Sequence, residues 1–197
     1  MQSYVRSASL VFALAIVAIA ASSPRAQSPA GWLDSPLAQW NQSVATLPAP
    51  STGAESPSAL ACRCGSNAAK GPSADAVSKA GWVPFLHQDR PLVRDDLEVL
   101  GGMSSASAGC EASVFNLFVF AAGRYAGTIA PAAMTTARDG AVGTVRFTGA
   151  DALTAEFARY TPGDTECCPS SRVRVTYRID RSGGRPVLVA TETRPIR

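Results

Sequence analysis

The chain has 197 residues, of which 46% are hydrophobic, 17% charged and 7% aromatic, with a single histidine. This composition is too apolar for a disordered tail and too poor in long apolar runs for a multi-pass membrane protein, so it predicts a soluble folded domain. Arg6 and Arg25 fall in a segment that we expect to be removed, which leaves 16 basic against 15 acidic residues. A net charge of +1 argues against nucleic acid and anionic membranes as partners attracted from a distance.

Residues 1–26 predict a secretory signal peptide. Arg6 precedes twelve apolar residues, 10–21, and small residues follow. Twelve residues span ~18 Å as a helix, short of the ~30 Å hydrocarbon core, which favours cleavage over an uncleaved anchor. Cleavage after Ala20 or Ala26 fits the pattern, and we prefer Ala26. Because no cysteine precedes Cys62, we expect no lipid anchor, and the mature chain has no predicted transmembrane helix.

Residues 27–60 predict a helix followed by a connector. Ser35 is a suitable N-cap and Pro36 suits the first helical position. Apolar residues then recur at helical spacing up to Leu47, and they are Leu37, Trp40, Val44 and Leu47. Residues 48–58 are rich in Pro, Ser and Gly, which is typical of an exposed connector.

Residues 61–197 predict a single α+β domain. A second short helix covers 74–80, and the pattern then alternates with a period of two. The expected strands are 114–120, 125–129, 144–148, 153–160, 172–180 and 186–191, with the first two forming a hairpin. We therefore expect one or two short N-terminal helices packed on an antiparallel sheet of about six strands, stapled by disulfides.

Four stretches carry a resemblance to a known family. They are residues 118–131 (FVFAAGRYAGTIAP), 137–140 (ARDG), 155–171 (AEFARYTPGDTECCPSS) and 173–179 (VRVTYRI). Together they resemble the bacterial LppP/LprE lipoprotein family over about residues 62–196, most specifically over 160–177. The resemblance implies a small exported or envelope-anchored domain without an assigned activity, and it supplies no catalytic residue.

Five cysteines, Cys62, Cys64, Cys110, Cys167 and Cys168, are the candidates for disulfides. In an exported chain such cysteines persist as disulfides, and two bridges would leave one thiol. Adjacent cysteines bond to each other only through a strained ring, so we expect Cys167 or Cys168 to pair across the fold. The alternative is a soft-metal or redox site formed by Cys62, Cys64, Cys167, Cys168 and His87.

Catalysis has no recognisable signature in this chain. The one imidazole, His87, falls in an expected surface loop beside Asp89, and no G-x-S-x-G turn is present. We therefore predict no enzymatic activity, no catalytic residue and no cofactor.

A basic ridge is the sequence's candidate binding surface. Arg172, Arg174 and Arg178 alternate with apolar residues and would line the outer face of one strand. They could instead pair with carboxylates such as Glu156 or Asp180 on neighbouring strands. The leading prediction is a periplasmic or secreted bacterial protein that acts by binding an envelope component or protein partner. The alternative is a thiol-based metal or redox protein of the periplasm.

Overall fold

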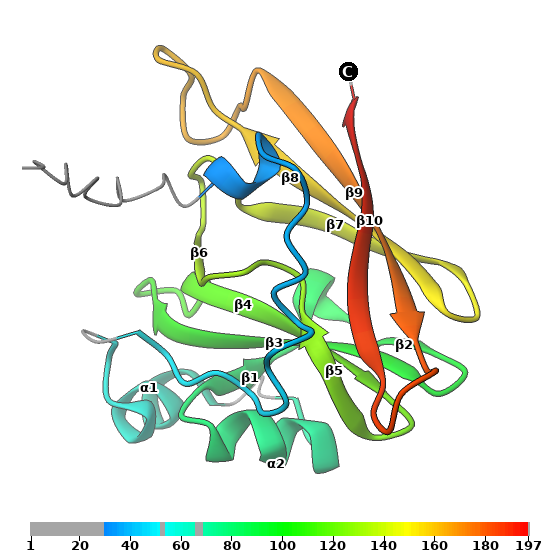
Figure 1. Cartoon of the computed structure of the whole chain (residues 1–197). Coiled ribbons are helices and arrows are strands. Elements are labelled where there is room, and N and C mark those ends of the chain that lie inside the picture. Colours follow the sequence, from blue (N-terminus) through cyan, green and yellow to red (C-terminus); the bar gives the residue numbers. More distant parts are fainter. Residues whose placement is uncertain (1–29, 52–53, 66–68, 197) are drawn as a thin grey trace, which may run out of the picture.

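The computed structural model describes residues 30–51, 54–65 and 69–196 (Figure 1). Its described part contains two eight-residue α-helices and ten strands in two antiparallel sheets. None of the helices in these ranges is long and apolar enough to cross a membrane. The predicted signal peptide and both of its cleavage positions lie outside the described residues.

The larger sheet has six strands and follows the chain from residue 83 to residue 135. Its central path runs β1-β3-β4-β5, while β2 pairs with β3 and β6 pairs with β4. The strands are β1 (Val83–Phe85), β2 (Leu92–Arg94), β3 (Leu97–Ala106), β4 (Ala112–Ala121), β5 (Arg124–Thr128) and β6 (Met134–Thr135). Between β1 and β2, a short 3-10 turn, η3, spans His87–Asp89.

The smaller sheet has four strands in the order β10-β9-β8-β7. They are β7 (Val142–Gly149), β8 (Ala152–Arg159), β9 (Ser171–Asp180) and β10 (Val187–Ile196). In β9 the buried residues alternate with exposed ones, as the sequence pattern requires for a sheet with one solvated face. Figure 1 shows this sheet crossing over one face of the larger sheet.

The main core lies between the two sheets. Leu117 of β4 belongs to the same buried cluster as Phe157 and Tyr177 of the smaller sheet, and all three side chains are fully buried. The Tyr177 hydroxyl donates a hydrogen bond of 2.7 Å to the carbonyl of Ile129, so this buried polar atom is satisfied. Burying each such side chain contributes roughly 1.5–3 kcal/mol.

A second core covers the other face of the larger sheet. Helix α2 (Pro72–Lys79) places Val77 against Trp82 and Phe118, and Pro72 at its first turn fits the start of a helix. Helix α1 (Pro57–Cys64) also begins on a proline and contributes the fully buried Leu60 to the main core. This helix occupies part of the segment that the sequence assigns to the connector.

The α+β fold class is confirmed, and the observed strands divide between two sheets. The hairpin β4–β5 turns at Ala122 and Gly123, both at positive φ, and α2 occupies the second predicted helix. The sequence does not reveal β3, whose centre is Gly101-Gly102. A Cβ at Gly101 would lie 2.5 Å from the Phe85 ring, so the glycine admits an aromatic neighbour in a strand. The division of the chain at residue 60 stays a prediction.

The predicted helix after Ser35 is wrong. Residues Gly31–Leu33 form a single 3-10 turn, η1, and residues 34–50 form a strap of turns, bends and irregular backbone. The Trp40 indole N–H donates to the Thr128 carbonyl at 3.2 Å, and Gln39 Nε2 donates to the Ala190 carbonyl at 2.9 Å. These bonds to both sheets replace the bonds within a helix. Trp32 of η1 packs edge-on against Phe157 of β8, which anchors the start of this segment to the smaller sheet.

Candidate anion-binding groove

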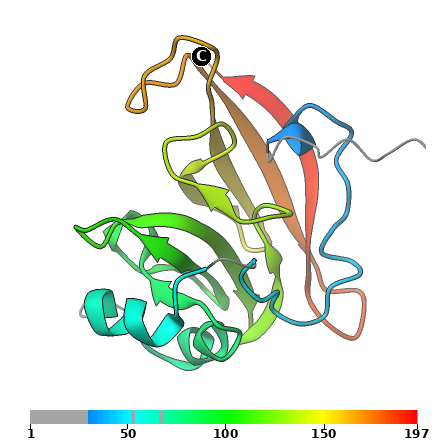
Figure 2. The ribbon, with the colours of Figure 1, turned by 90° about the vertical axis from the view of Figure 1, so that its left-hand side faces the viewer.

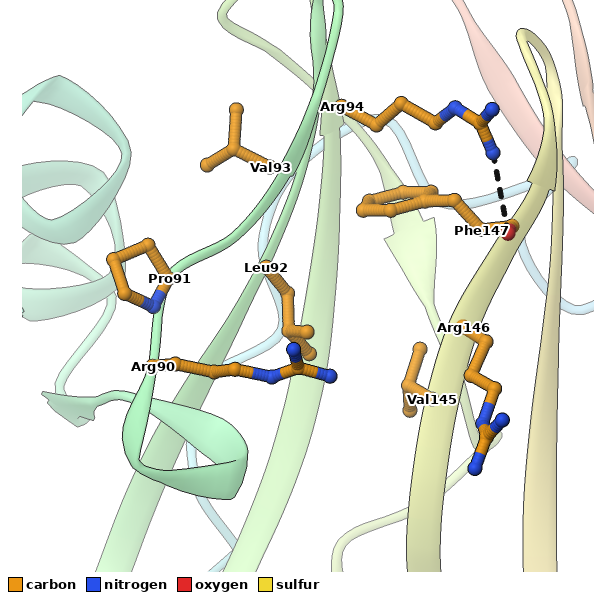
Figure 3. Close-up of a pocket in the computed structure, with 8 residues that line it drawn as sticks. All are labelled: Arg90, Pro91, Leu92, Val93, Arg94, Val145, Arg146 and Phe147. Carbon is orange, nitrogen blue, oxygen red and sulfur yellow. Dashed lines mark hydrogen bonds between the residues drawn. The ribbon is translucent and has the colours of Figure 1, made fainter.

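A groove of about 290 Å³ lies where an edge of the larger sheet faces an edge of the smaller one (Figure 3). One wall is β2 with the two residues before it, and the other is β7. The lining residues are Arg90, Pro91, Leu92, Val93, Arg94, Val145, Arg146 and Phe147. Three of these eight residues are arginines, so guanidinium groups dominate the polar lining of the groove.

Strand pairing explains how β2 presents its side chains. Leu92 pairs with Val99 and Arg94 pairs with Leu97, which leaves the opposite edge of β2 without a strand partner. Leu92 is buried towards the main core, whereas Val93 is 58% exposed and points away from β7 (Figure 3). The apolar floor of the groove is therefore formed by Leu92 together with Val145 and Phe147 of the facing strand.

The turn after β2 is fixed by Arg181, which directly follows β9 of the smaller sheet. Arg181 donates two hydrogen bonds of 2.8 Å to the carboxylate of Asp96 and one of 2.7 Å to that of Asp151. The hydrogen bonds from Arg181 hold the pKa of Asp96 below its ordinary value. The contact is exposed, so it orients the turn more than it stabilises the fold.

Side chains from residues 87–94 cover the outer edge of β7. His87 Nε2, Gln88 Nε2 and Arg94 Nη1 donate to the carbonyls of residues 143, 145 and 147, at 2.8, 3.4 and 3.2 Å. Alternate residues of a strand direct their carbonyls to the same edge, so three donors in succession meet three outward carbonyls. The edge is capped by side chains, which leaves the groove between the two strands.

His87 is a structural residue here. The sequence predicts a surface loop, but the side chain is only 9% exposed and joins the two sheets through Gly143. Burial lowers the pKa of His87, partly offset by the hydrogen bond to Gly143. The neutral tautomer that carries its proton on Nε2 makes this bond.

The three groove arginines lack carboxylate partners among the described residues. Arg90, Arg94 and Arg146 are exposed, and none forms an ion pair within this part of the chain. Asp89 and Asp95 are adjacent in sequence but form no ion pair with them. Unpaired guanidinium groups around one groove suit a carboxylate or a phosphate, which they can contact with two parallel N–H donors.

The sequence-predicted ridge lies elsewhere, on the exposed face of β9. Arg174 donates to Glu156 at 2.7 Å, and Arg178 lies 3.9 Å from Asp180. Arg172 lines two cavities beside Tyr160, of about 270 and 400 Å³. The structure therefore places the three arginines on one face, with carboxylates beside two of them. Their binding role stays a prediction.

The disulfides differ from the expected pairing. Cys64 bonds to Cys110, and Cys167 bonds to its neighbour Cys168, while Cys62 is an exposed free thiol. The expectation that Cys167 or Cys168 pairs across the fold is wrong. The reason is distance, because the loop of residues 161–170 and helix α1 lie at opposite ends of the molecule (Figures 1 and 2).

The two bonds also differ in what they can stabilise. The Cys64–Cys110 bond joins residues 46 apart in sequence, which corresponds to about 4 kcal/mol of loop-closure entropy removed from the unfolded chain. The five candidate ligands of the metal alternative, Cys62, Cys64, Cys167, Cys168 and His87, do not converge. Within the described ranges no group of three or more His, Cys, Asp and Glu side chains is placed to hold a metal ion.

The groove could not be located from sequence because Arg90 and Arg94 are more than 50 residues away from Arg146. The signal present in the sequence is local and weak: Arg90 and Arg94 flank the apolar residues of β2, and Arg146 alternates with Val145 and Phe147 in β7. Only the packing of two sheets brings the two sets together.

Comparison with known proteins supports the family resemblance. The LppP/LprE lipoprotein family model matches residues 96–182, which run from the turn before β3 to the turn after β9. The match includes Arg146 and both cysteines of the 161–170 loop, whereas Arg90 and Arg94 lie outside it. No curated protein and no solved structure matches the chain. The resemblance read from the sequence is thus confirmed over residues 96–182.

Proposed function

We propose that this chain is an exported, non-catalytic binding protein of the bacterial envelope, and that its arginine groove binds a carboxylate or phosphate group. One observation carries the proposal: Arg90, Arg94 and Arg146 line the same groove and have no carboxylate partner among the described residues. The arginines of the β9 ridge are weaker candidates, because Glu156 already accepts two hydrogen bonds from Arg174.

The shape of the groove favours an acidic group attached to a small apolar body. A volume of about 290 Å³ is at the lower end for ligand sites, so one acidic group with a few attached atoms fills it. Leu92 and Val145 supply an apolar floor; the Arg90 side chain extends towards β7, whereas the Arg146 side chain extends from β7 on the side away from β2 (Figure 3). A ligand of this kind satisfies the guanidinium charges and removes apolar surface from water.

Export is supported by the family match and by the Cys64–Cys110 disulfide, since such bonds persist in oxidising spaces. A non-catalytic role is supported by the position of His87, whose Nε2 is engaged by a backbone carbonyl. The alternative of a thiol-ligated metal protein is weakened because its five candidate ligands lie apart. Periplasmic or secreted localisation follows from the same proposal.

The test compares two triple variants with the same change in charge. Arg90, Arg94 and Arg146 are replaced by Ser in one, and Arg172, Arg174 and Arg178 in the other. Retention on isolated bacterial cell-wall material and titration with inorganic phosphate and citrate are measured for both. A hydrogen bond to a charged group contributes about 1.5–3 kcal/mol, so the groove variant should bind at least about tenfold more weakly. The ridge variant should bind like the parent.

A double variant, Arg90→Ser with Arg146→Ser, separates binding from folding because it keeps the bond from Arg94 to Phe147. It should also lose affinity while its thermal midpoint stays that of the parent. Unchanged binding in both groove variants overturns the proposal. Loss in the ridge variant alone would transfer the binding role to β9.

A further inference from the structure

The loop between β8 and β9 carries two bonded neighbours at its exposed end. Cys167 and Cys168 form a disulfide, and both residues are exposed. The loop projects away from the two sheets in both ribbon views (Figures 1 and 2). A soluble thiol can therefore reach the sulfur atoms without any opening of the fold.

This loop is closed at its base without help from the disulfide. The Asp164 carboxylate accepts hydrogen bonds from the backbone N–H groups of Thr161 and Ser170, at 2.7 and 3.0 Å. These bonds lower the pKa of Asp164. The Tyr160 hydroxyl adds a bond of 2.7 Å to the Glu166 carbonyl. The loop conformation thus has its own supports on both sides of the cysteine pair.

A bond between adjacent residues contributes little to stability through the unfolded chain. Disulfides stabilise mainly by removing loop-closure entropy, which grows with the number of residues enclosed. The Cys64–Cys110 bond joins residues 46 positions apart and has Cys64 buried, whereas the Cys167–Cys168 bond joins direct neighbours. The bond is exposed, it is not needed to close the loop, and it adds little to stability. These three properties point to a chemical role for the bond rather than a stabilising one.

We propose that Cys167–Cys168 is a thiol–disulfide exchange site that accepts two electrons from a dithiol. A thiolate of the dithiol attacks one sulfur, the bond between Cys167 and Cys168 breaks, and a mixed disulfide forms. The second thiol of the reductant then attacks the mixed disulfide and releases the cysteine. Two electrons and two protons pass to the cysteine pair, and the dithiol becomes a disulfide. The site is separate from the arginine groove, and neither proposal depends on the other.

The surroundings of the two sulfur atoms differ, which selects the sulfur that is attacked. Thr165 Oγ1 lies 3.2 Å from Cys167 Sγ, where its hydroxyl can donate to a thiolate. A stabilised thiolate is the better leaving group, so Cys167 leaves and the attacking sulfur bonds to Cys168. Replacing Thr165 by Val should slow the exchange and leave the loop base intact.

The experiment uses the full mature chain with Cys62→Ser, because the exposed Cys62 thiol could otherwise exchange with either bond. Samples are equilibrated in glutathione buffers of increasing reducing strength, alkylated, and counted by intact mass. Cys167 and Cys168 should become alkylated together while Cys64 and Cys110 stay bonded and the circular dichroism stays native. The adjacent pair should need at least a hundredfold lower ratio of reduced to oxidised glutathione than the other bond. Adducts trapped early should carry glutathione on Cys168.

The matched control replaces Cys167 and Cys168 together by Ser. It should take up no label in the loop, and its thermal midpoint should stay within about 2 °C of the parent. The proposal is overturned if the two bonds are reduced together, or if the adjacent pair resists reduction until the chain unfolds. A control variant that loses its fold would overturn it as well, since the bond would then be a staple.

Discussion

At both edges of the four-stranded sheet, side chains donate hydrogen bonds to the outward carbonyls of the edge strand. One of these edges is buried, whereas a groove stays open beside the other. At the β10 edge, Gln39 and Asn41 of the strap donate to the carbonyls of residues 190 and 188, at 2.9 and 3.0 Å. At the β7 edge, donors from residues 87–94 reach the carbonyls of residues 143, 145 and 147. In both places the acceptor carbonyls are two residues apart along the edge strand, and side chains bind them without a strand being added.

The difference lies in burial. Asn41 is 2% exposed, and its side-chain oxygen Oδ1 accepts a hydrogen bond from the Thr128 N–H at 2.9 Å. The side-chain amide of this one residue therefore joins β5 to β10. At the other edge the donor side chains include the exposed Arg94, and a groove remains open beside them. A cap made by a buried amide closes a joint between sheets, whereas a cap made by an exposed arginine leaves a surface that can bind.

Removing the side-chain hydrogen bonds at the β10 edge should lower the free energy of unfolding more than any other change considered below. The substitution Asn41→Ala removes the acceptor of the Thr128 N–H and the donor to the Leu188 carbonyl, so both of these groups lose a hydrogen bond in a buried place. Each unsatisfied group costs about 1–3 kcal/mol, so the free energy of unfolding should fall by roughly 3 kcal/mol. Urea denaturation with the disulfides intact measures it. The exposed neighbour variant Gln42→Ala should match the parent, and an equal loss in both would refute the role of the amide.

Replacing His87, the buried donor at the β7 edge, should lower the free energy of unfolding by less than replacing Asn41. His87→Ala removes the donor to Gly143 and leaves a void beside the turn, which should lower the free energy of unfolding by about 2 kcal/mol. His87→Gln keeps an N–H donor and should recover part of this loss. The same denaturation series decides the point, and a loss as large as that of Asn41→Ala would mean that the two edges are equally sealed.

The two edges should also differ in their response to pH. Burial lowers the pKa of His87 in the folded protein, so between the unfolded pKa of about 6.5 and the lower folded pKa the unfolded chain binds more protons. Stability should therefore be complete above about pH 6.5 and fall as the pH decreases below it, by at most about 1.4 kcal/mol per pH unit. His87→Gln should flatten this dependence above pH 5. An unchanged slope in that variant would assign the effect to other groups.

The smallest effect on stability is expected at the rim of the groove. Arg90 makes one long contact of 3.4 Å, to Gln88, and no ion pair in the described part of the chain. Arg90→Ser should change the free energy of unfolding by less than about 0.5 kcal/mol. Arg94→Ser should cost somewhat more, because it removes the donor to the Phe147 carbonyl. A thermal melt of both variants beside the phosphate titration would show whether stability and binding separate at this edge.

The sequence predicts the regular part of the fold because alternation carries real information there. In β9, Val173, Val175 and Tyr177 are buried as the pattern requires. The same reasoning fails for the strap, because the helical spacing of Leu37 and Trp40 occurs there in turns and irregular backbone. The decisive bonds of the strap reach residues about 90 and 150 positions away, and no local pattern records them.

The candidate site is harder to predict than the fold for a related reason. The ridge on β9 can be recognised from sequence because all three arginines lie on one strand with a period of two. The groove needs Arg146 beside Arg90, and this proximity depends on how two sheets pack. The cysteine pairing is similar: chain chemistry disfavours a bond between neighbours, but the position of the 161–170 loop leaves Cys167 and Cys168 no other partner within reach.

The strap has a consequence for the order in which the molecule can be completed. Asn41 and Leu188 are separated by 147 residues, so the joint that seals β10 unites opposite ends of the described chain. During synthesis from the N-terminus, Asn41 emerges 147 residues before its acceptor, the Leu188 carbonyl. The sheet edge can close only after β10 has been made, and such non-local contacts slow the final step of folding. A chain shortened before β10 would expose both the strap amide and the main core, and quality-control proteases would meet it as an unfinished molecule.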